Sequence, residues 1–581
     1  MNNNKYLQMF PCIVFTGLAY GAICFLYLPK PLISVLCLFA LYYISKRGLP
    51  ISASKREWVF SAVFGALFTV SAVWGKNLVD YGAAQVFHVR TILLSVCLCP
   101  FAVNVMKLFF TFHVQLSDKG QKTSNDKAVF FLCWILFVLT YIPVLLAFYP
   151  GIASYDVHGQ LEQVFNNEYT LKHPWIHTEF MGIIIRKVHG VTGNWNLGVF
   201  AHSFAQTLIM TGVFSYLCTW IYRFSKSRIL FAASVLFYIV LPIHPLFAVT
   251  TTKDTLFSAG VSMVVVKLLE LGQEDAGSAF HKKKQIIVLA FLFFLMLIFR
   301  NNAMYAVLLW LPLLLLYVVR RRREGNGAVM IISLILAFLL MIPYQYALKN
   351  YVHAEDGPEK EKYSVPIQQM ARVYNENTDE LPEQEKEILE TLFHSGAETL
   401  LKYEARKADV VKERLEQEVL EEHWKEYCDL WINWGLRYPV TYFEAWMNLI
   451  NGYFCFDDEI PDQQTYRTYI EIRCDMSELM DVSFESKIPK LFELYYALFE
   501  MGGCQKVPFL SVVCQLAFYD WALILTAAYL WQKKRYHFLL PLALLLTLLA
   551  TNLLGPVAIL RYIYPVVVCF PLMIFVFVKS L

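Results

Sequence analysis

Long apolar runs follow one another along most of this chain, and they predict membrane-spanning helices. A helix needs about 20 predominantly apolar residues to cross the roughly 30 Å hydrocarbon core of a bilayer. Runs that approach or reach this length lie at 10–28, 31–45, 58–74, 90–112, 128–148, 196–221, 229–249, 254–271, 286–299, 303–319, 328–347, 508–531, 537–553 and 562–578. Because several runs are short, we expect about 12–14 transmembrane helices. The predicted fold class is an all-α polytopic membrane protein.

The composition favours a membrane protein over a soluble one. Of the 581 residues, 57% are hydrophobic and 17% are charged, whereas soluble domains carry about 25% charged residues. No signal peptide with a small-residue cleavage site stands at the start. We therefore expect residues 10–28 to be retained as the first span.

Basic clusters between the apolar runs orient the predicted spans, because cytoplasmic loops carry an excess of Lys and Arg. With the N-terminus in the cytoplasm, every such cluster falls on the cytoplasmic side. The clusters are Lys46, Arg47, Lys55 and Arg56; Lys119, Lys122 and Lys127; Arg223, Lys226 and Arg228; Lys282 to Lys284; Arg320 to Arg323; and Lys533, Lys534 and Arg535. We expect a multi-pass protein with both termini in the cytoplasm. The clusters also explain the basic charge without nucleic acid as a partner.

The charge is distributed unevenly along the chain. Together with the predicted spans, it divides the chain into four predicted regions. Residues 348–507 hold 33 acidic and 17 basic residues, a net charge of −16, whereas the rest of the chain carries +19. We expect 348–507 to be an external, mainly helical domain, because 383–430 carries apolar residues at helical spacing. The other regions are an N-terminal module of four spans at 1–127, a core at 128–347 with an external loop at 149–195, and C-terminal spans at 508–581.

The aromatic segment 431–454 of the acidic region is predicted to pack on the membrane face. The whole domain is interpreted either as a structural cap or as a contact surface for an acceptor or for lipid. It also contains Cys428, Cys455, Cys474 and Cys504. Outside the cell these would pair as disulfides or stay as free thiols.

The external loop 149–195 contains an isolated acid, Asp156, and the histidines His158, His173 and His177. Ionisable groups beside a bilayer are costly unless water, a partner or a substrate meets them. A carboxylate at position 156 suits a general base. The same residue also suits a turn or a cap, because Pro150, Gly151 and Ser154 precede it.

His173 and His177 are four residues apart, with Pro174 at the position favoured for the start of a helix. We expect both rings on one face of a short surface helix that runs to about residue 189. They are candidates for substrate hydrogen bonding, for interfacial packing, or for a metal site with a third ligand. No HExxH motif is present. We expect that no cofactor is required; a divalent metal is compatible with these residues, but no motif supports it.

Three basic residues lie at predicted span ends on the external side: Lys253, Arg300 and Arg561. Such side chains reach lipid headgroups by snorkelling, or together they form an anion site. Lys253 would lie in the first turn of a helix whose N-terminus favours phosphate, with Asp254 or Thr252 as its cap. We expect Lys253, Asp254, Arg300 and Arg561 to bind a lipid-linked phosphate.

Short motifs give the chain a resemblance to known membrane proteins. The motifs are YPG-x-x-SYD-x-x-x-Q from Tyr149 to Gln160, HP-x-x-HT from His173 to Thr178, KDT from Lys253 to Thr255, RYPVTY at 437–442 and RYIYP at 561–565. Over roughly residues 128–581 they resemble bacterial membrane proteins of the DUF6020 type. The arrangement also resembles the GT-C superfamily of polytopic glycosyltransferases.

The GT-C resemblance implies a core in which an acid of the first long external loop acts as the base. It also implies a polyprenyl-phosphate-linked sugar donor. Asp156 occupies the matching position. The chain departs from the common pattern because its loop follows the fifth predicted span, which makes 1–127 an added module. The loop also lacks a DxD motif or an Asp-Glu pair, so the resemblance gives no support to a metal-dependent mechanism.

These observations lead to the hypothesis of a glycosyltransferase in the bacterial plasma membrane. It would move a sugar from the lipid-linked donor to an external glycan or lipid acceptor of the cell envelope. Asp156 would be the base, and His158, His173 and His177 would contact substrate. The alternatives are a transporter or lipid flippase, which would show inverted repeats and charges at mid-membrane, a surface-polysaccharide polymerase or ligase, and a non-catalytic scaffold.

Overall fold

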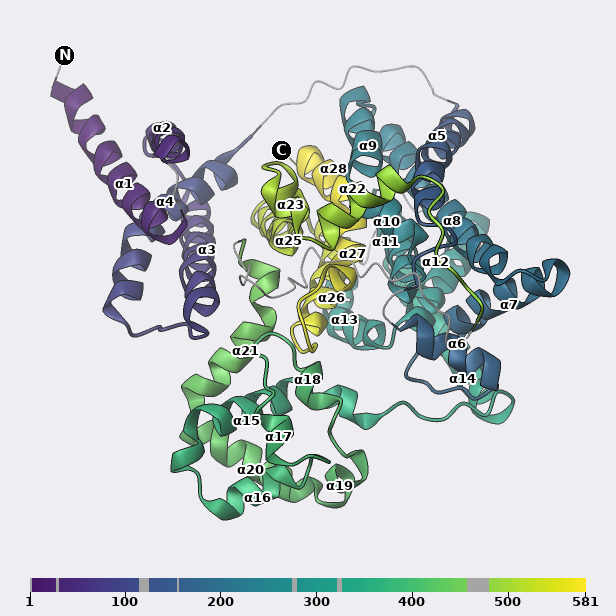
Figure 1. Cartoon of the computed structure of the whole chain (residues 1–581). Coiled ribbons are helices and arrows are strands. Elements are labelled where there is room, and N and C mark those ends of the chain that lie inside the picture. Colours follow the sequence, from purple (N-terminus) through teal and green to yellow (C-terminus); the bar gives the residue numbers. More distant parts are fainter. Residues whose placement is uncertain are drawn as a thin grey trace.

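The computed structural model describes residues 3–27, 31–113, 125–153, 156–273, 279–320, 326–456 and 480–580. The regular structure in these ranges is helical, with isolated β-bridges and no strands (Figure 1). The predicted class, an all-α polytopic membrane protein, is confirmed.

Seven helices in the described ranges are long and apolar enough to cross a membrane. They are α3 (Lys55–Tyr81), α4 (Val89–Thr111), α5 (Asp126–Ala147), α8 (Trp195–Ser225), α11 (Lys253–Gln273), α13 (Asn302–Arg320) and α14 (Asn326–Asn350). Two bent pairs raise the number to nine if each is one span: α9 (Arg228–Val240) with α10 (Ile243–Val249), and α27 (Leu560–Val568) with α28 (Phe570–Ser580). The bends are 56° and 43°.

The described helices therefore give seven to nine spans, fewer than the 12–14 expected. Short or interrupted apolar stretches explain the difference. α26 (Tyr536–Asn552) has 17 residues, and α12 (Ala279–Phe299) begins with a lysine run that shortens its apolar part. The apolar run 508–531 is divided between α24 (Leu510–Val513) and α25 (Leu516–Gln532).

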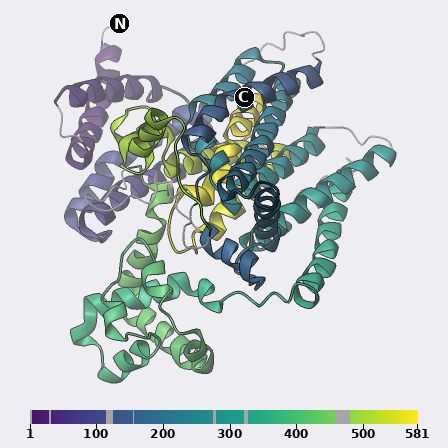
Figure 2. The ribbon, with the colours of Figure 1, turned by 45° about the vertical axis from the view of Figure 1, so that its right-hand side comes forward.

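The N-terminal module consists of α1 (Asn3–Tyr27), α2 (Pro31–Gly48), α3 and α4, and it lies to one side of the other transmembrane helices (Figures 1 and 2). A capping box begins α3: Ser54 Oγ accepts from Glu57 N, and the Glu57 side chain accepts from Ser54 N. The same end of α3 contacts the C-terminal helices. Arg56 donates to Trp531 O at 2.6 Å, and Glu57 lies 3.4 Å from Lys533.

The central bundle is built from helices that are far apart in the sequence. Its hydrophobic core takes residues from α5, α8 to α14, α22 (Pro489–Phe499) and α25 to α28. Phe214 stacks on Tyr238 with ring centroids 4.3 Å apart, and Trp310 Nε1 donates to Leu540 O at 2.9 Å. The predicted regions 128–347 and 508–581 thus share one core.

A compact helical domain stands below the bundle in Figure 1 and has a core of its own. It contains η2 (Glu359–Tyr363), α15 (Ser364–Asn377), η3 (Thr378–Glu380), α16 (Glu383–Glu390), α17 (Ala397–Leu400), α18 (Asp409–Lys412), α19 (Gln417–Glu422) and α20 (Trp424–Arg437). Trp434 is fully buried, and its Nε1 donates to Glu385 at 2.7 Å.

The helix α21 (Pro439–Phe454) leaves this domain and enters the membrane bundle, where it packs against α3 and α25. Asn448 donates to Gly82 O at 3.0 Å, and Asn451 donates to Gly75 O at 3.1 Å. A Cβ at Gly75 would lie 2.8 Å from Asn451 Oδ1 and from Cys455. The close approach of α3 to α21 therefore requires glycine. Much of 431–454 lies between membrane helices rather than on their outer face.

Residues 489–506 of the acidic region also join the bundle. α22 packs on α5, with the rings of Phe148 and Phe492 5.3 Å apart, and α23 (Gly503–Lys506) follows it. Within the described ranges, Cys428, Cys455 and Cys504 are not joined in disulfides. Cys474 lies outside those ranges.

Candidate functional site

Two connections at one end of the central bundle lie side by side. Ile152, which follows α5, pairs with the segment that joins α10 to α11. Ile152 N donates to Val249 O at 3.2 Å, and Thr251 N donates to Ile152 O at 2.9 Å. Thr251 Oγ1 also donates to Ile152 O at 2.7 Å. This pairing brings Asp156 beside Lys253, the first residue of α11.

Asp156 stands at the N-cap position of α6 (Val157–Asn166), but its carboxylate makes no capping hydrogen bond. One carboxylate oxygen lies 2.8 Å from Lys253 Nζ and 3.4 Å from Arg561 Nη1. Burial opposes ionisation, but Lys253 and Arg561 outweigh it and hold the pKa of the Asp156 carboxyl well below its usual range. The side chain is therefore an ionised member of a charge cluster. Ser154, from the predicted turn, lies outside the described residues.

Asp254 joins the two arginines of this cluster. Its Oδ1 lies 2.7 Å from Arg300 Nη1, and its Oδ2 lies 3.9 Å from Arg561 Nη1. Thr252 Oγ1 donates to Asp254 Oδ2 at 3.2 Å. The Asp254 side chain has no exposed surface. Its contacts position the guanidinium groups, and it does not face outward as a ligand would require.

The charged cluster, defined as Asp156, Lys253, Asp254, Arg300 and Arg561, has one positive charge in excess. Its three cationic side chains are only 12–15% exposed. The guanidinium groups of Arg300 and Arg561 lie 4.6 and 5.0 Å from the centroid of the Tyr562 ring. A surplus cation beside the N-terminus of α11 suits an anionic ligand.

His173 joins the cluster through Lys253, whose Nζ lies 3.3 Å from His173 Nδ1. An ammonium group can only donate, so Nδ1 accepts and the ring proton of the neutral form sits on Nε2. Burial, followed by the charge of Lys253, lowers the pKa of His173 to about 4. The ring is therefore neutral at pH 7.

The prediction that His173 and His177 share one helix face is wrong. α7 (Trp175–Thr192) begins after both His173 and Pro174, because Pro174 is extended (φ −61°, ψ 113°) and serves as the N-cap. His177 is fully buried, and Gln160 Nε2 donates to its Nδ1 at 3.1 Å. Gln160 also donates to Thr178 at 2.9 Å. His177 thus joins α6 to α7.

Burial lowers the pKa of His177 well below its usual value, so this ring is also neutral at pH 7. His158 lies on the first turn of α6 and is exposed. The neighbouring Gly159 faces His173, since a Cβ there would lie 3.8 Å from His173 Nε2. His173 contacts the cations through Lys253.

Three further residues belong to the site's surroundings. Gln160 is part of the YPG-x-x-SYD-x-x-x-Q motif, which was the available signal for it, and Tyr562 adjoins Arg561. His202 of α8 is fully buried, with its ring 6.2 Å from that of His177. It lies within a predicted apolar span, so the sequence offered no signal. Among the described residues, neither ring nitrogen of His202 has a hydrogen-bond partner.

The possible metal site has no third ligand in the described part of the chain. No three His, Cys, Asp or Glu side chains there are placed to hold a metal ion. The described contacts of His173 and His177 are with Lys253 and Gln160.

A comparison with protein families places the chain in one of them. DUF6020, a family of unknown function, matches residues 163–580. The matched range contains His173, His177 and all members of the charged cluster except Asp156, which precedes it as His158 does. No curated protein and no solved structure matches. Because the match covers well over half of its length, this chain belongs to the DUF6020 family.

Proposed function

We propose that this protein is a membrane glycosyltransferase of the GT-C type. It transfers a sugar from a polyprenyl-phosphate-linked donor to an external glycan or lipid of the cell envelope. The observation that carries the proposal is the charged cluster, in which an ionised Asp156 lies beside cations that outnumber the carboxylates.

The cations suit the phosphate of a lipid-linked donor. Lys253 begins α11, Arg300 directly follows α12, and Arg561 lies in the first turn of α27. All three sit at ends of apolar helices, which is where the phosphate of a membrane lipid lies. Charge-assisted hydrogen bonds from Lys and Arg, together with the free N–H groups of a helix N-terminus, favour phosphate.

Asp156 is placed to act as the base of an inverting transfer. The contact with Lys253 keeps the carboxylate ionised and lowers its basicity. A phosphate that takes over Lys253 and Arg561 restores that basicity. The acceptor O–H then gives its proton to Asp156, the acceptor oxygen forms a bond to sugar C1, and the C1–O bond to phosphate breaks with its electron pair leaving on the phosphate.

One carboxylate suffices for this reaction, because a departing phosphate needs cations rather than a proton. Glycoside hydrolysis differs, since its leaving oxygen must be protonated by a second acid. In the proposed reaction His173, as a neutral ring held by Lys253, orients the donor phosphate. His158 is exposed on the first turn of α6 and contacts the acceptor or the sugar.

The proposal is tested by the release of lipid phosphate from a defined donor. The full chain is placed in proteoliposomes with synthetic polyprenyl-phosphate hexoses and a cell-envelope glycan extract as acceptor. General-base catalysis contributes about 10²–10⁴-fold. Asp156→Asn should therefore slow release at least about 100-fold. Glu168→Gln, at an exposed carboxylate just beyond α6, is the matched control.

Release by Asp156→Asn at the wild-type rate would exclude Asp156 as the base. Movement of the intact donor across the bilayer without release of the sugar would favour the flippase alternative.

A further inference from the structure

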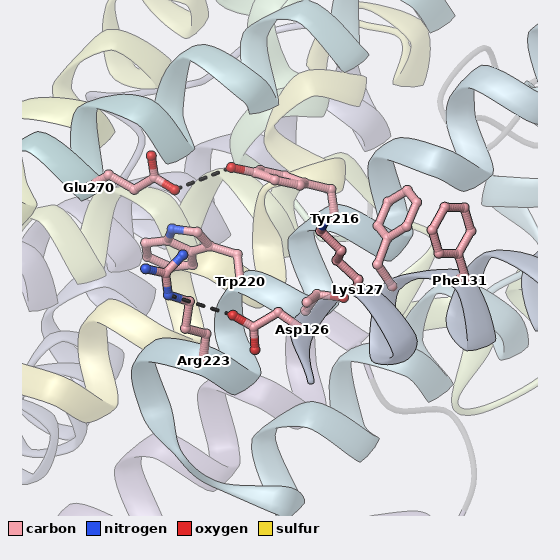
Figure 3. A pocket seen from close by; sticks show the side chains of 9 residues that line it. Asp126, Lys127, Phe131, Tyr216, Trp220, Arg223 and Glu270 are labelled. Carbon is pink, nitrogen blue, oxygen red and sulfur yellow. Dashed lines mark hydrogen bonds and ion pairs between the residues drawn. The ribbon is translucent and has the colours of Figure 1, made fainter. Parts of the chain in front are cut away.

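A second site lies at the opposite end of the bundle from the charged cluster. It is a cavity of about 190 Å³ between α5, α8 and α11 (Figure 3). α5 begins at the cavity and ends near Asp156, whereas α8 and α11 end at the cavity. Residues of both charge signs and several aromatic rings line it: Asp126, Lys127, Phe130, Phe131, Tyr216, Thr219, Trp220, Arg223 and Glu270.

An apolar groove of about 640 Å³ continues from this cavity, and the two share Phe130 and Tyr216. Its walls include Trp134, Ala205, Ile209 and Gly212 from α5 and α8. Its volume is within the range of ligand-binding cavities, roughly 300–1,000 Å³. Phe131 at the cavity and Ile209 in the groove are 52% and 41% exposed, so the two open sideways, toward the lipid.

The length of the groove corresponds to one leaflet of a bilayer. On α8 it extends from Ala205 to Tyr216, which at about 1.5 Å per residue is about 16 Å. The hydrocarbon core is about 30 Å thick. The groove therefore accommodates the chains of a lipid from the leaflet at the cavity's end of the bundle. The basic clusters predict this leaflet to be cytoplasmic.

The cavity at the mouth of the groove offers groups for a zwitterionic headgroup. Arg223 Nε lies 3.8 Å from Asp126, and the two side chains are 59% and 42% exposed. Lys127 is exposed beside them. A phosphate fits Lys127 and Arg223, and an ammonium fits Asp126. Glu270 closes the other side of the cavity, where it accepts from Tyr216 at 3.2 Å.

Trp220 supplies an independent observation that points to a ligand at the cavity. Its side chain is 3% exposed, and Nε1 has no hydrogen-bond partner among the described residues. Buried polar groups are nearly always paired. A phosphate or ester oxygen of a lipid at this cavity would accept from Trp220 Nε1.

We propose that the cavity and groove bind one phospholipid with an amine-bearing, zwitterionic headgroup. Its phosphate contacts Lys127 and Arg223, and its acyl chain lies in the groove. The site is independent of the transferase site, since it lies at the other end of the bundle. The lipid lies in the groove that α5 and α8 line.

Native mass spectrometry of the purified full chain tests this proposal. The protein is titrated with phosphatidylethanolamine or phosphatidylglycerol, and the bound lipid is counted. We expect a preference for phosphatidylethanolamine. The double variant Lys127→Gln/Arg223→Gln should bind phosphatidylethanolamine about tenfold more weakly, because charge-assisted hydrogen bonds to the phosphate are lost. Arg228→Gln, an exposed arginine that does not line the cavity, should bind as wild type does.

The groove is tested separately by Gly212→Leu. A Cβ at Gly212 lies 3.7 Å from Trp134 Nε1, an ordinary contact, so the longer side chain extends into the groove without a backbone clash. Gly21→Leu on α1, where a Cβ meets no atom within 4 Å, is the control. Trp220→Phe removes the indole donor and should weaken binding.

Equal binding of phosphatidylglycerol would overturn the headgroup assignment. Undiminished binding in Gly212→Leu would overturn the groove. Asp156→Asn should leave lipid binding unchanged, so a failure of the proposed transferase activity does not affect this test.

Discussion

The ammonium group of Lys253 lies 2.8 Å from the carboxylate of Asp156. This contact joins a connecting loop to the first residue of the buried helix α11. The backbone pairing of Ile152 with Val249 and Thr251 holds the two side chains at this distance. The distance between the two groups therefore depends on the packing of the loop, and their contact keeps the proposed base ionised.

Asp156→Asn should destabilise the protein in a pH-dependent manner. A carboxylate with a lowered pKa in the folded state stabilises the fold above its ordinary pKa of about 3.9, and this contribution is lost as the pH falls through the folded-state pKa. We expect the variant to unfold with about 1–3 kcal/mol less free energy at pH 7. Thermal unfolding in detergent measures it, and the difference from wild type should shrink below about pH 4.

His173 should make the protein less stable at mildly acidic pH. Its pKa falls from 6.5 to about 4 on folding, so between these values the unfolded chain binds a proton that the folded chain does not. Stability therefore falls as the pH drops through this window. His173→Gln should remove up to roughly 3 kcal/mol of that pH dependence. His394→Gln, with a side chain that is 91% exposed, is the control, and an equal effect there would contradict the prediction.

Arg300→Gln should be among the most destabilising single changes in the charged cluster. Asp254 is fully buried, and Arg300 is its nearest cation at 2.7 Å. Removal of one partner from a buried ion pair costs about 3–5 kcal/mol, because the other charge is left uncompensated. Arg300→Gln/Asp254→Asn should be more stable than Arg300→Gln alone. A double-mutant cycle of thermal unfolding measures the coupling, and purely additive effects would argue against the ion pair.

Gly75→Ala should separate α3 from α21. The new Cβ would lie 2.8 Å from Asn451 and Cys455, and overpacking of this kind costs about 1–3 kcal/mol. Gly21→Ala in α1 has open space and should be neutral or slightly stabilising. Hydrogen exchange should become faster in α21 of the Gly75 variant alone. Unchanged exchange there would show that the two helices are not coupled through this contact.

The sequence alone was sufficient for the class of fold and for most of the residues that the structure brings together. Long apolar runs require helices in a bilayer, since the backbone must be satisfied internally, and the all-α polytopic fold follows from that. Lys253, Arg300 and Arg561 stood out because cations at span ends are conspicuous in an apolar chain. The sequence predicted that these cations lie near Asp156, and the structure places Lys253 and Arg561 within 3.4 Å of its carboxylate.

Tertiary contacts decided what local patterns leave open. The four-residue spacing of His173 and His177 suggested one helix face, but the extended conformation at Pro174 separates them. The aromatic segment 431–454 had the composition of an interfacial element, and only the approach of α3 at Gly75 shows that α21 lies between membrane helices. Helical periodicity records which residues share a side of one helix. The pairing of Ile152 with Val249, and with it the position of Asp156, depends on contacts between distant segments that no local pattern contains.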